Sequence, residues 1–160
     1  MVENMNLHGR TKDCNANFVT TLLPTNLKTV LVVDQDLGFV FWVGRALDAM
    51  HYFAVPAKSV LDAALLIMQL DLKKVDLLMI NLELTGGYDF ISAMHRLLPD
   101  IRVIGIADDP LKPVNMIGVD AVRPRPDVAD EAVRMEWMGW IENLMARSPQ
   151  VVPIRNGTTR

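Results

Sequence analysis

Cysteine, histidine and long apolar runs are scarce in this sequence. Cys14 is the only cysteine among 160 residues, so no disulfide can form within the chain, and a reducing, cytoplasmic setting is expected. No uncharged apolar run reaches membrane-spanning length, because Arg45, Asp48 and Asp62 interrupt the longest stretches. The N-terminal residues also lack the apolar segment of a signal peptide. These absences predict a protein without membrane contact.

Basic residues and phosphate-binding patterns are equally sparse. The net charge is −3 and the pI is near 5.5, with no stripe of Lys and Arg, which argues against nucleic-acid binding. The three histidines lie far apart, at His8, His51 and His95, so we expect no metal site. The Gly86–Gly87 pair is not part of a phosphate-binding fingerprint and indicates a turn instead. The composition therefore predicts no cofactor.

What the sequence does contain is an alternation of strand-like and helix-like segments. Short apolar runs typical of buried parallel strands alternate with segments in which apolar residues recur at helical spacing. Ser59 is placed to cap one of these helices. The strands are expected within residues 30–33, 52–56, 75–80, 101–107 and 121–126, and the helices within 37–50, 60–70, 88–98 and 127–147. This order predicts an α/β fold with a parallel sheet covered by helices on both faces.

The domain boundaries follow from the same pattern. Residues 1–26 lack periodicity and are predicted to be a flexible N-terminal arm, with 18–23 as a candidate docking segment. Residues 27–147 form the predicted domain, and 148–160 form a C-terminal tail. Between the fourth and fifth strands, Pro110 and Pro113 leave room only for a shortened fourth helix.

Four motifs carry a resemblance to a known family. In this order and spacing, LVVDQD, VDLLMINLELTGG, VIGIAD and GVDAVRPRP resemble the receiver domain of two-component response regulators, of the chemotaxis-receiver type. The resemblance covers about residues 28–147. It implies a flavodoxin-like, doubly wound, five-stranded sheet of order 2-1-3-4-5. It also implies a role in phosphorelay signal transduction.

The resemblance further implies a phosphorylation pocket that is degenerate in this chain. The family's acidic pair that holds Mg²⁺ falls on Asp34 and Gln35, and its phosphoryl-accepting aspartate falls on Asn81. The hydroxyl residue after the fourth strand falls on Ala107, and the lysine falls on Arg125. The aromatic switch residue corresponds to Val122. Only Asp34 is retained, and the family's bond before the proline implies a cis peptide between Arg125 and Pro126.

These substitutions change what the pocket can do. Acyl-phosphate formation needs an ionised carboxylate, which the amide of Asn81 does not supply, and Mg²⁺ prefers carboxylate oxygens. We therefore expect no enzymatic activity, no metal and no catalytic residue. One hypothesis is an internal ion pair between Asp34 and Arg125, hydrogen-bonded by Asn81. The alternative is that Arg125 points to solvent while Asp34 only caps the following helix.

The final helix suggests a contact surface. Its predicted core stripe is flanked by Met138 and Met145, and Met-rich surface is common at protein interfaces. We expect a protein partner or a second copy, forming a homodimer, to bind the edge made by the fifth strand and this helix. The alternative is that residues 18–23 cover the patch within the same chain. The core stripe consists of Val133, Trp137, Trp140, Ile141 and Leu144.

Three functions stay open at this point. The first is a stand-alone receiver-like domain that signals through protein contact without aspartyl phosphorylation. The second is a phosphorelay receiver with an unconventional acceptor, Asp34 or Asp36. The third is a small-ligand sensor that uses the vacated pocket.

Overall fold

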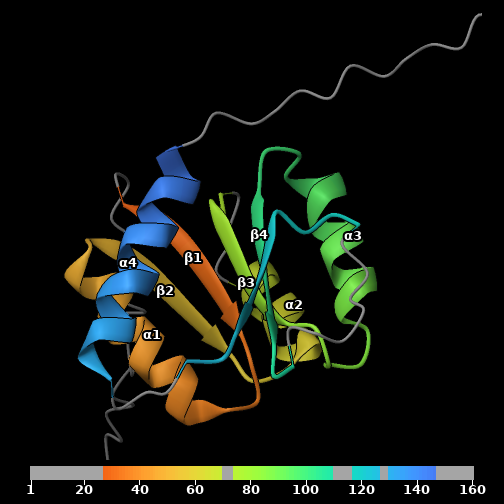
Figure 1. The fold of residues 1–160 in the computed structure, drawn as a ribbon. Helices are drawn as coiled ribbons and strands as arrows, with labels where there is room; N and C mark the ends of the chain where they lie inside the picture. The colour runs from red at the N-terminus through yellow and green to blue at the C-terminus, as the bar shows by residue number, and fades with distance from the viewer. Residues whose placement is uncertain (1–26, 70–73, 110–116, 127–129, 147–160) are drawn as a thin grey trace, which may run out of the picture.

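The computed structural model describes residues 27–69, 74–109, 117–126 and 130–146. They form one five-stranded parallel sheet of order β2-β1-β3-β4-β5 (Figure 1). This is the flavodoxin-like arrangement expected from the alternation of elements, and that prediction is confirmed. The elements are β1 (Lys28–Val33), α1 (Leu37–Ala49), β2 (Tyr52–Ala57), α2 (Val60–Gln69), β3 (Leu77–Asn81), α3 (Gly87–Leu97), β4 (Arg102–Ala107), β5 (Ala121–Pro124) and α4 (Glu131–Ala146).

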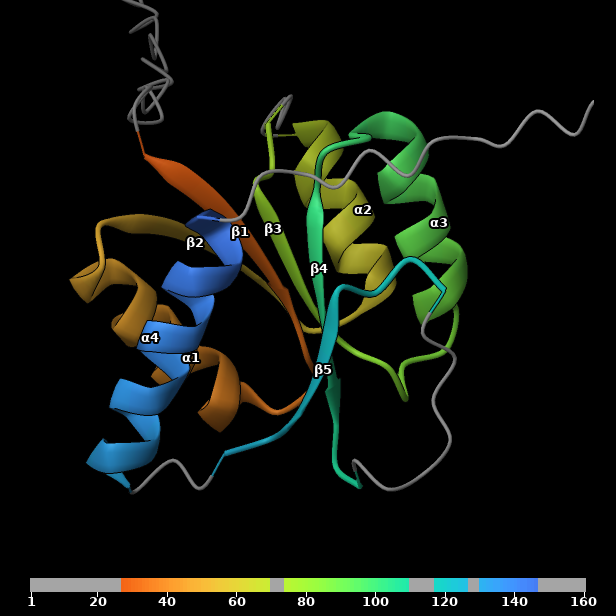
Figure 2. The same cartoon turned by 45° about the horizontal axis from the view of Figure 1, so that its top comes forward.

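The central strands are apolar along their whole length because helices cover both of their faces. Figure 2 shows α1 and α4 on one side of the sheet and α2 and α3 on the other. All five residues of β3 are buried, as are the last five of β4. Successive side chains of each strand point to opposite faces of the sheet, so they pack into two separate cores, one beneath α2 and α3 and one beneath α1 and α4.

Polar side chains start the helices where the strands end. Asp36 accepts a hydrogen bond from the backbone N–H of Phe39 at the start of α1 (3.1 Å). Ser59 accepts one from Asp62 N–H at the start of α2 (3.1 Å), as its position in the sequence predicts. Gly86, before α3, has a φ of 78°, a left-handed conformation that favours glycine. These caps fix the loops at the carboxyl ends of the strands.

The buried face of α4 is the one that the helical wheel predicted. Trp137, Ile141 and Leu144 are buried, as predicted, and Trp137 stacks edge-on against Phe39 and Trp42 of α1.

The flank of α4 that faces β5 carries Glu136 and Trp140. Arg123 of β5 pairs with Glu136 (3.4 Å) and lies over the ring of Trp140 (4.7 Å to its centroid). Met138 and Met145 lie roughly 180–200° around the helix from Glu136, on the opposite flank. They are half-buried against the core shared by α1 and α4. The expectation that these two methionines lie at the edge made by β5 and α4 is therefore corrected. The helical wheel predicted the stripe correctly but could not tell which flank meets β5.

Several sequence-based expectations fall outside the described residues. They are the N-terminal arm, the C-terminal tail and the shortened fourth helix, whose segment is 110–116. Within the described part of the chain, no helix is long and apolar enough to cross a membrane.

Candidate functional site

The candidate site lies where the carboxyl ends of four parallel strands meet. Asp34 follows β1, Asn81 ends β3, Ala107 ends β4 and Arg125 follows β5. Because the strands are parallel and in register, these positions share one edge of the sheet. The sequence predicts all four residues in one pocket, and in the structure Asp34 contacts both Asn81 and Arg125.

Asp34 is the buried centre of the site. Its side chain is fully buried, with 0% of the residue exposed. Both carboxylate oxygens lie 3.1 Å from the Nη2 of Arg125. Its Oδ1 also accepts hydrogen bonds from the backbone N–H of Asp36 (2.9 Å) and from the side-chain amide of Asn81 (3.4 Å). The burial of the carboxylate is thus compensated by a cation and two neutral donors.

The geometry gives a physical reason for an amide at position 81. The Nδ2 of Asn81 donates to Asp34, while its Oδ1 accepts a hydrogen bond from the backbone N–H of Glu83 (2.9 Å). An ionised carboxylate has two acceptor oxygens and no donor, so it cannot make the first of these bonds. Asn81 therefore suits a site in which it donates to the carboxylate of Asp34 and adds no negative charge of its own.

Arg125 is the cation of the site and joins three loops. Besides Asp34, its Nη1 contacts Asp108 Oδ1 at 2.8 Å, and its Nε lies 3.8 Å from Asp36 Oδ2. The last distance is too long for a hydrogen bond, and Nε is buried without a hydrogen-bond partner. The guanidinium also lies 6.0 Å from the centroid of the Phe39 ring. The hypothesis of an Asp34–Arg125 ion pair is confirmed, and the solvent-facing alternative is wrong.

The surroundings of Arg125 stabilise its charged form. Burial by itself lowers the pKa of Arg125, but the hydrogen bond to Asp34 and the charges of Asp34, Asp108 and Asp36 outweigh it and raise the pKa. The ordinary pKa of arginine is already far above neutral, so the cation is present at every physiological pH.

Among the described residues, the other expected members of the pocket form no hydrogen bond or ion pair with Asp34 or Arg125. Gln35 is exposed, and Ala107 is buried at the end of β4 without a polar group to offer. Val122 is half-buried in β5 and packs against the core beneath α2 and α3. Asp108 is the member that the sequence reasoning missed. Its position directly after β4 was the available signal, because the same rule that selected Asp34 applies to it.

One expectation about this site is wrong. The peptide bond between Arg125 and Pro126 is trans, since the described residues contain no cis peptide. Trans is the lower-energy form even before proline, by about 0.5–1 kcal/mol. The guanidinium reaches Asp34 from this trans backbone, so the ion pair does not require the cis form.

Comparison with solved structures gives receiver domains. Response regulator TrrA of Thermotoga maritima, in complex with Mg²⁺ and BeF, superposes with a TM-score of 0.59 at 16% identity, over 74% of this chain and 99% of that one. The response regulator domain of T. maritima CheB gives 0.58 at 18% identity, over 77% and 99% of the two chains. HP1043, an orphan response regulator of H. pylori, gives 0.58 at 18% identity, over 74% and 96%.

At these identities the likeness establishes the fold, which is that of a response-regulator receiver domain. No protein-family model matches the sequence, and a comparison with curated proteins finds no match.

The donor set does not fit the Mg²⁺ site that this fold implies. Both oxygens of Asp34 face the guanidinium of Arg125, so a cation already occupies that side of the carboxylate. Asn81 turns an N–H donor toward Asp34, and a donor nitrogen is not a ligand for a hard cation. Among the described residues there is no group of three or more His, Cys, Asp or Glu side chains that could hold a metal ion.

Proposed function

We propose that this chain is a receiver-like signalling domain that acts through protein contact, without aspartyl phosphorylation and without enzymatic activity. The observation that carries the proposal is the contact of Arg125 with both oxygens of Asp34 at 3.1 Å, beside a neutral Asn81. A carboxylate nucleophile is absent from the end of β3, and the retained carboxylate is buried and paired. The pocket is therefore charge-compensated without phosphate or metal.

The direct test is the intact mass of the full chain after incubation with acetyl phosphate and Mg²⁺. The expected result is an unchanged mass, while a receiver domain with a complete acidic set, treated in parallel, gains one phosphoryl group. A stoichiometric gain on this chain would overturn the proposal.

The same geometry bears on the alternative of an unconventional phosphoryl acceptor, for which the candidates are Asp34 and Asp36. Asp34 offers no free oxygen to a phosphoryl donor, because its two oxygens are occupied by Arg125 and the site amides. Asp36 is partly exposed and also caps α1 through Oδ1. A phosphorelay role would therefore fall on Asp36. A mass gain that disappears in Asp36→Asn would establish that role.

The ligand-sensor alternative has less support at the strand ends. Three cavities lie along α1, bordered by β2, by α2 or by the start of α4, and neither Asn81 nor Arg125 lines any of the three. A small molecule that raises the melting temperature of the wild type but not of Arg125→Lys would favour a sensor.

Signalling without chemistry requires a contact surface, and we place it at the edge formed by β5 and α4. β5 is an edge strand of four residues, of which three are partly exposed and Pro124 is exposed. Arg123 lies there between Glu136 and Trp140, on the α4 flank that faces the strand. Arginine and tryptophan are enriched where proteins bind one another. The partner is a second copy or another protein, and the proposed location is the cytoplasm.

A further inference from the structure

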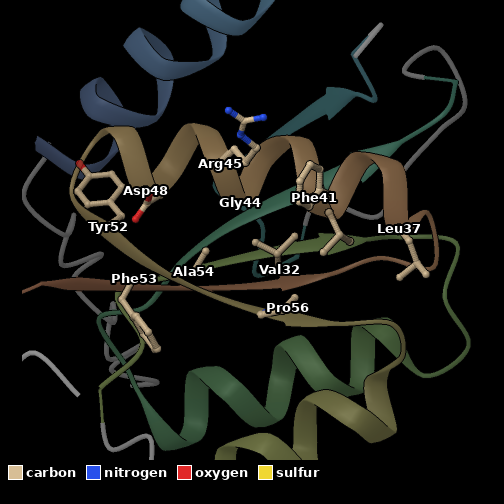
Figure 3. Close-up of a pocket in the computed structure, with 11 residues that line it drawn as sticks. Val32, Leu37, Phe41, Gly44, Arg45, Asp48, Tyr52, Phe53, Ala54 and Pro56 are labelled. Atoms are coloured by element: carbon tan, nitrogen blue, oxygen red, sulfur yellow. The ribbon is translucent and has the colours of Figure 1, made fainter. Parts of the chain in front are cut away.

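An apolar groove runs along the opposite edge of the molecule, between α1 and β2. It has a volume of about 610 Å³. Leu37 and Phe41 form its outer wall and are 66% and 68% exposed. Gly44, one helical turn further along α1, has nothing within 4 Å of the place where a Cβ would stand, which leaves the middle of the groove open. Figure 3 shows α1 above the groove, with Val32, Ala54 and Pro56 of the strands beneath it.

The polar residues of the groove leave it without net charge. Arg45 and Asp48, both on α1, line it together with the apolar side chains. Their formal charges cancel, so an uncharged apolar segment is a better match than an acidic or basic one. Other apolar side chains continue the surface past the edge strand onto α2, where Leu65 lines an adjoining cavity together with Leu37.

The edge strand itself is not suited to accept another strand. The carbonyl of Ala57 accepts a hydrogen bond from the N–H of Asp34, so the backbone groups of residue 57 point toward β1. Successive residues of a strand point their backbone groups to opposite sides, so those of Pro56 point outward. Proline has no N–H, which interrupts strand addition at the carboxyl end of this edge. An occupant that runs the whole length of the groove therefore binds through side chains.

The N-terminal residues of the same chain enter the domain at one end of this groove. Lys28, the first residue of β1, is in register with Tyr52, which lines the groove. The Lys28 ammonium also lies 5.8 Å from the centroid of the Tyr52 ring. Four residues, 24–27, separate Lys28 from the apolar segment 18–23, and four extended residues span up to about 14 Å. The stretch from Leu37 to Asp48 along α1 is about 17 Å long, so the segment is within reach.

The composition of that segment matches the groove. Residues 18–23 read FVTTLL, with four apolar side chains in six residues. The sequence carries no charge between Asp13 and Lys28. The covalent link adds a further advantage, because a short tether gives an effective concentration in the millimolar range, which a separate partner must exceed.

From these observations we propose that residues 18–23 dock in the groove between α1 and β2 of their own domain. The docking buries Leu37 and Phe41 and closes this edge of the molecule to other proteins. It leaves the β5–α4 edge on the far side of the sheet as the surface open to a partner. The arm and the partner site are then separate, so the docking holds or fails independently of the proposed function.

The only cysteine provides the probe. Cys14 lies four residues before Phe18, so a nitroxide attached to it in the full chain reports where the segment sits. Amide signals of the residues of α1 and β2 along the groove, as far as Leu37, should lose intensity in the spectrum of the isotope-labelled protein. Phe18→Asp with Leu22→Asp should restore them. The matched control, Asn15→Asp with Asn17→Asp, adds the same charge outside the segment and should leave the loss unchanged.

A second variant tests the groove from its other side. Phe41→Asp should release the segment, whereas Met135→Asp, at a residue that is 62% exposed on α4, should not. Signal loss confined to the Tyr52 end, or the same loss in Phe18→Asp with Leu22→Asp, would overturn the proposal. A mixing experiment tests for a second chain as the occupant. Isotope-labelled protein without nitroxide is mixed with nitroxide-labelled protein without isotope label. Loss of the same amide signals in this mixture would overturn the proposal, because the occupant would then belong to another chain.

Discussion

At the scale of single residues, the chemistry of the site depends on which side chains donate hydrogen bonds and which accept them. Asp34 is fully buried, and each partner that it has is a donor: Arg125, Asn81 and a backbone N–H. The Arg125 cation therefore compensates the charge, and Asn81 avoids adding another.

Removing the cation should leave a buried charge unpaired. Arg125→Ala is expected to destabilise the protein by about 3 kcal/mol, because breaking a buried pair by deleting one partner is strongly unfavourable. Arg123→Ala is the matched control, since its pair with Glu136 is exposed and is expected to cost about 1 kcal/mol or less. Denaturant unfolding measures both values. Adding Asp34→Asn to Arg125→Ala should recover part of the loss, and equal losses for the two arginine variants would contradict the assignment.

Restoring a carboxylate at position 81 should not restore phosphorylation. Asn81→Asp places an acceptor oxygen where an amide now donates to Asp34 at 3.4 Å, and Arg125 stands beside it as a counter-ion. Gln35 and Ala107 still lack the carboxylate and hydroxyl of the family. Intact mass after treatment with acetyl phosphate and Mg²⁺ should show no stoichiometric gain. Robust phosphorylation of this single variant would show that the other substitutions matter little.

The ion pair could be predicted from the sequence because Asp34, Asn81 and Arg125 all lie at the carboxyl ends of predicted parallel strands. Asp108 obeys the same rule but was missed because the family pattern directed attention to Ala107. The trans bond at Arg125–Pro126 could not be predicted, because it depends on where the backbone leaves β5.

At the scale of elements, hydrophobic periodicity predicted every strand and helix that the structure describes. It did not give the orientation of α4, because a stripe on a helix defines a face but not which neighbour lies on each flank. The contacts of Arg123 with Glu136 and Trp140 supply that information.

β4 contains a glycine that its packing requires. A Cβ on Gly105 would lie 2.5 Å from Leu82 Cδ1 and 2.9 Å from Leu82 Cγ. Gly105→Ala is therefore expected to destabilise the protein by about 1–3 kcal/mol, because Leu82 is buried and must shift.

Gly139→Ala is the control for this substitution. Gly139 lies in α4 with nothing within 4 Å of the added Cβ, and alanine should stabilise the helix by about 0.5–1 kcal/mol. Thermal and denaturant unfolding of the two variants should therefore shift in opposite directions. A neutral Gly105→Ala would show that Leu82 moves freely.

At the scale of the whole molecule, the described sheet ends in two edge strands, β2 and β5, with different surroundings. The β2 edge borders an apolar groove and carries an outward-facing proline, whereas the β5 edge carries a charged and aromatic cluster. We expect the partner or second copy at the β5 edge.

Reversing the charge at Arg123 tests this surface. Arg123→Glu sets like charges side by side at Glu136 and should weaken association on the order of tenfold, a loss of about 1.4 kcal/mol. Met138→Glu with Met145→Glu should leave association intact while lowering the melting temperature, because both side chains pack against the core. Sedimentation velocity or co-purification from the source cell measures association. If the methionine variant loses the partner and Arg123→Glu keeps it, the surface lies on the other flank of α4.

The Asp34–Arg125 contact also has a consequence for the time course of folding. It joins residues 91 positions apart, and Asp34 directly follows β1, the strand that lies between β2 and β3. Because Arg125 follows the last strand of the sheet, we expect this contact to form late in folding, past the main barrier. A substitution at Arg125 should then leave the refolding rate nearly unchanged and accelerate unfolding. The lifetime of the folded molecule, more than the speed with which it forms, depends on this one arginine.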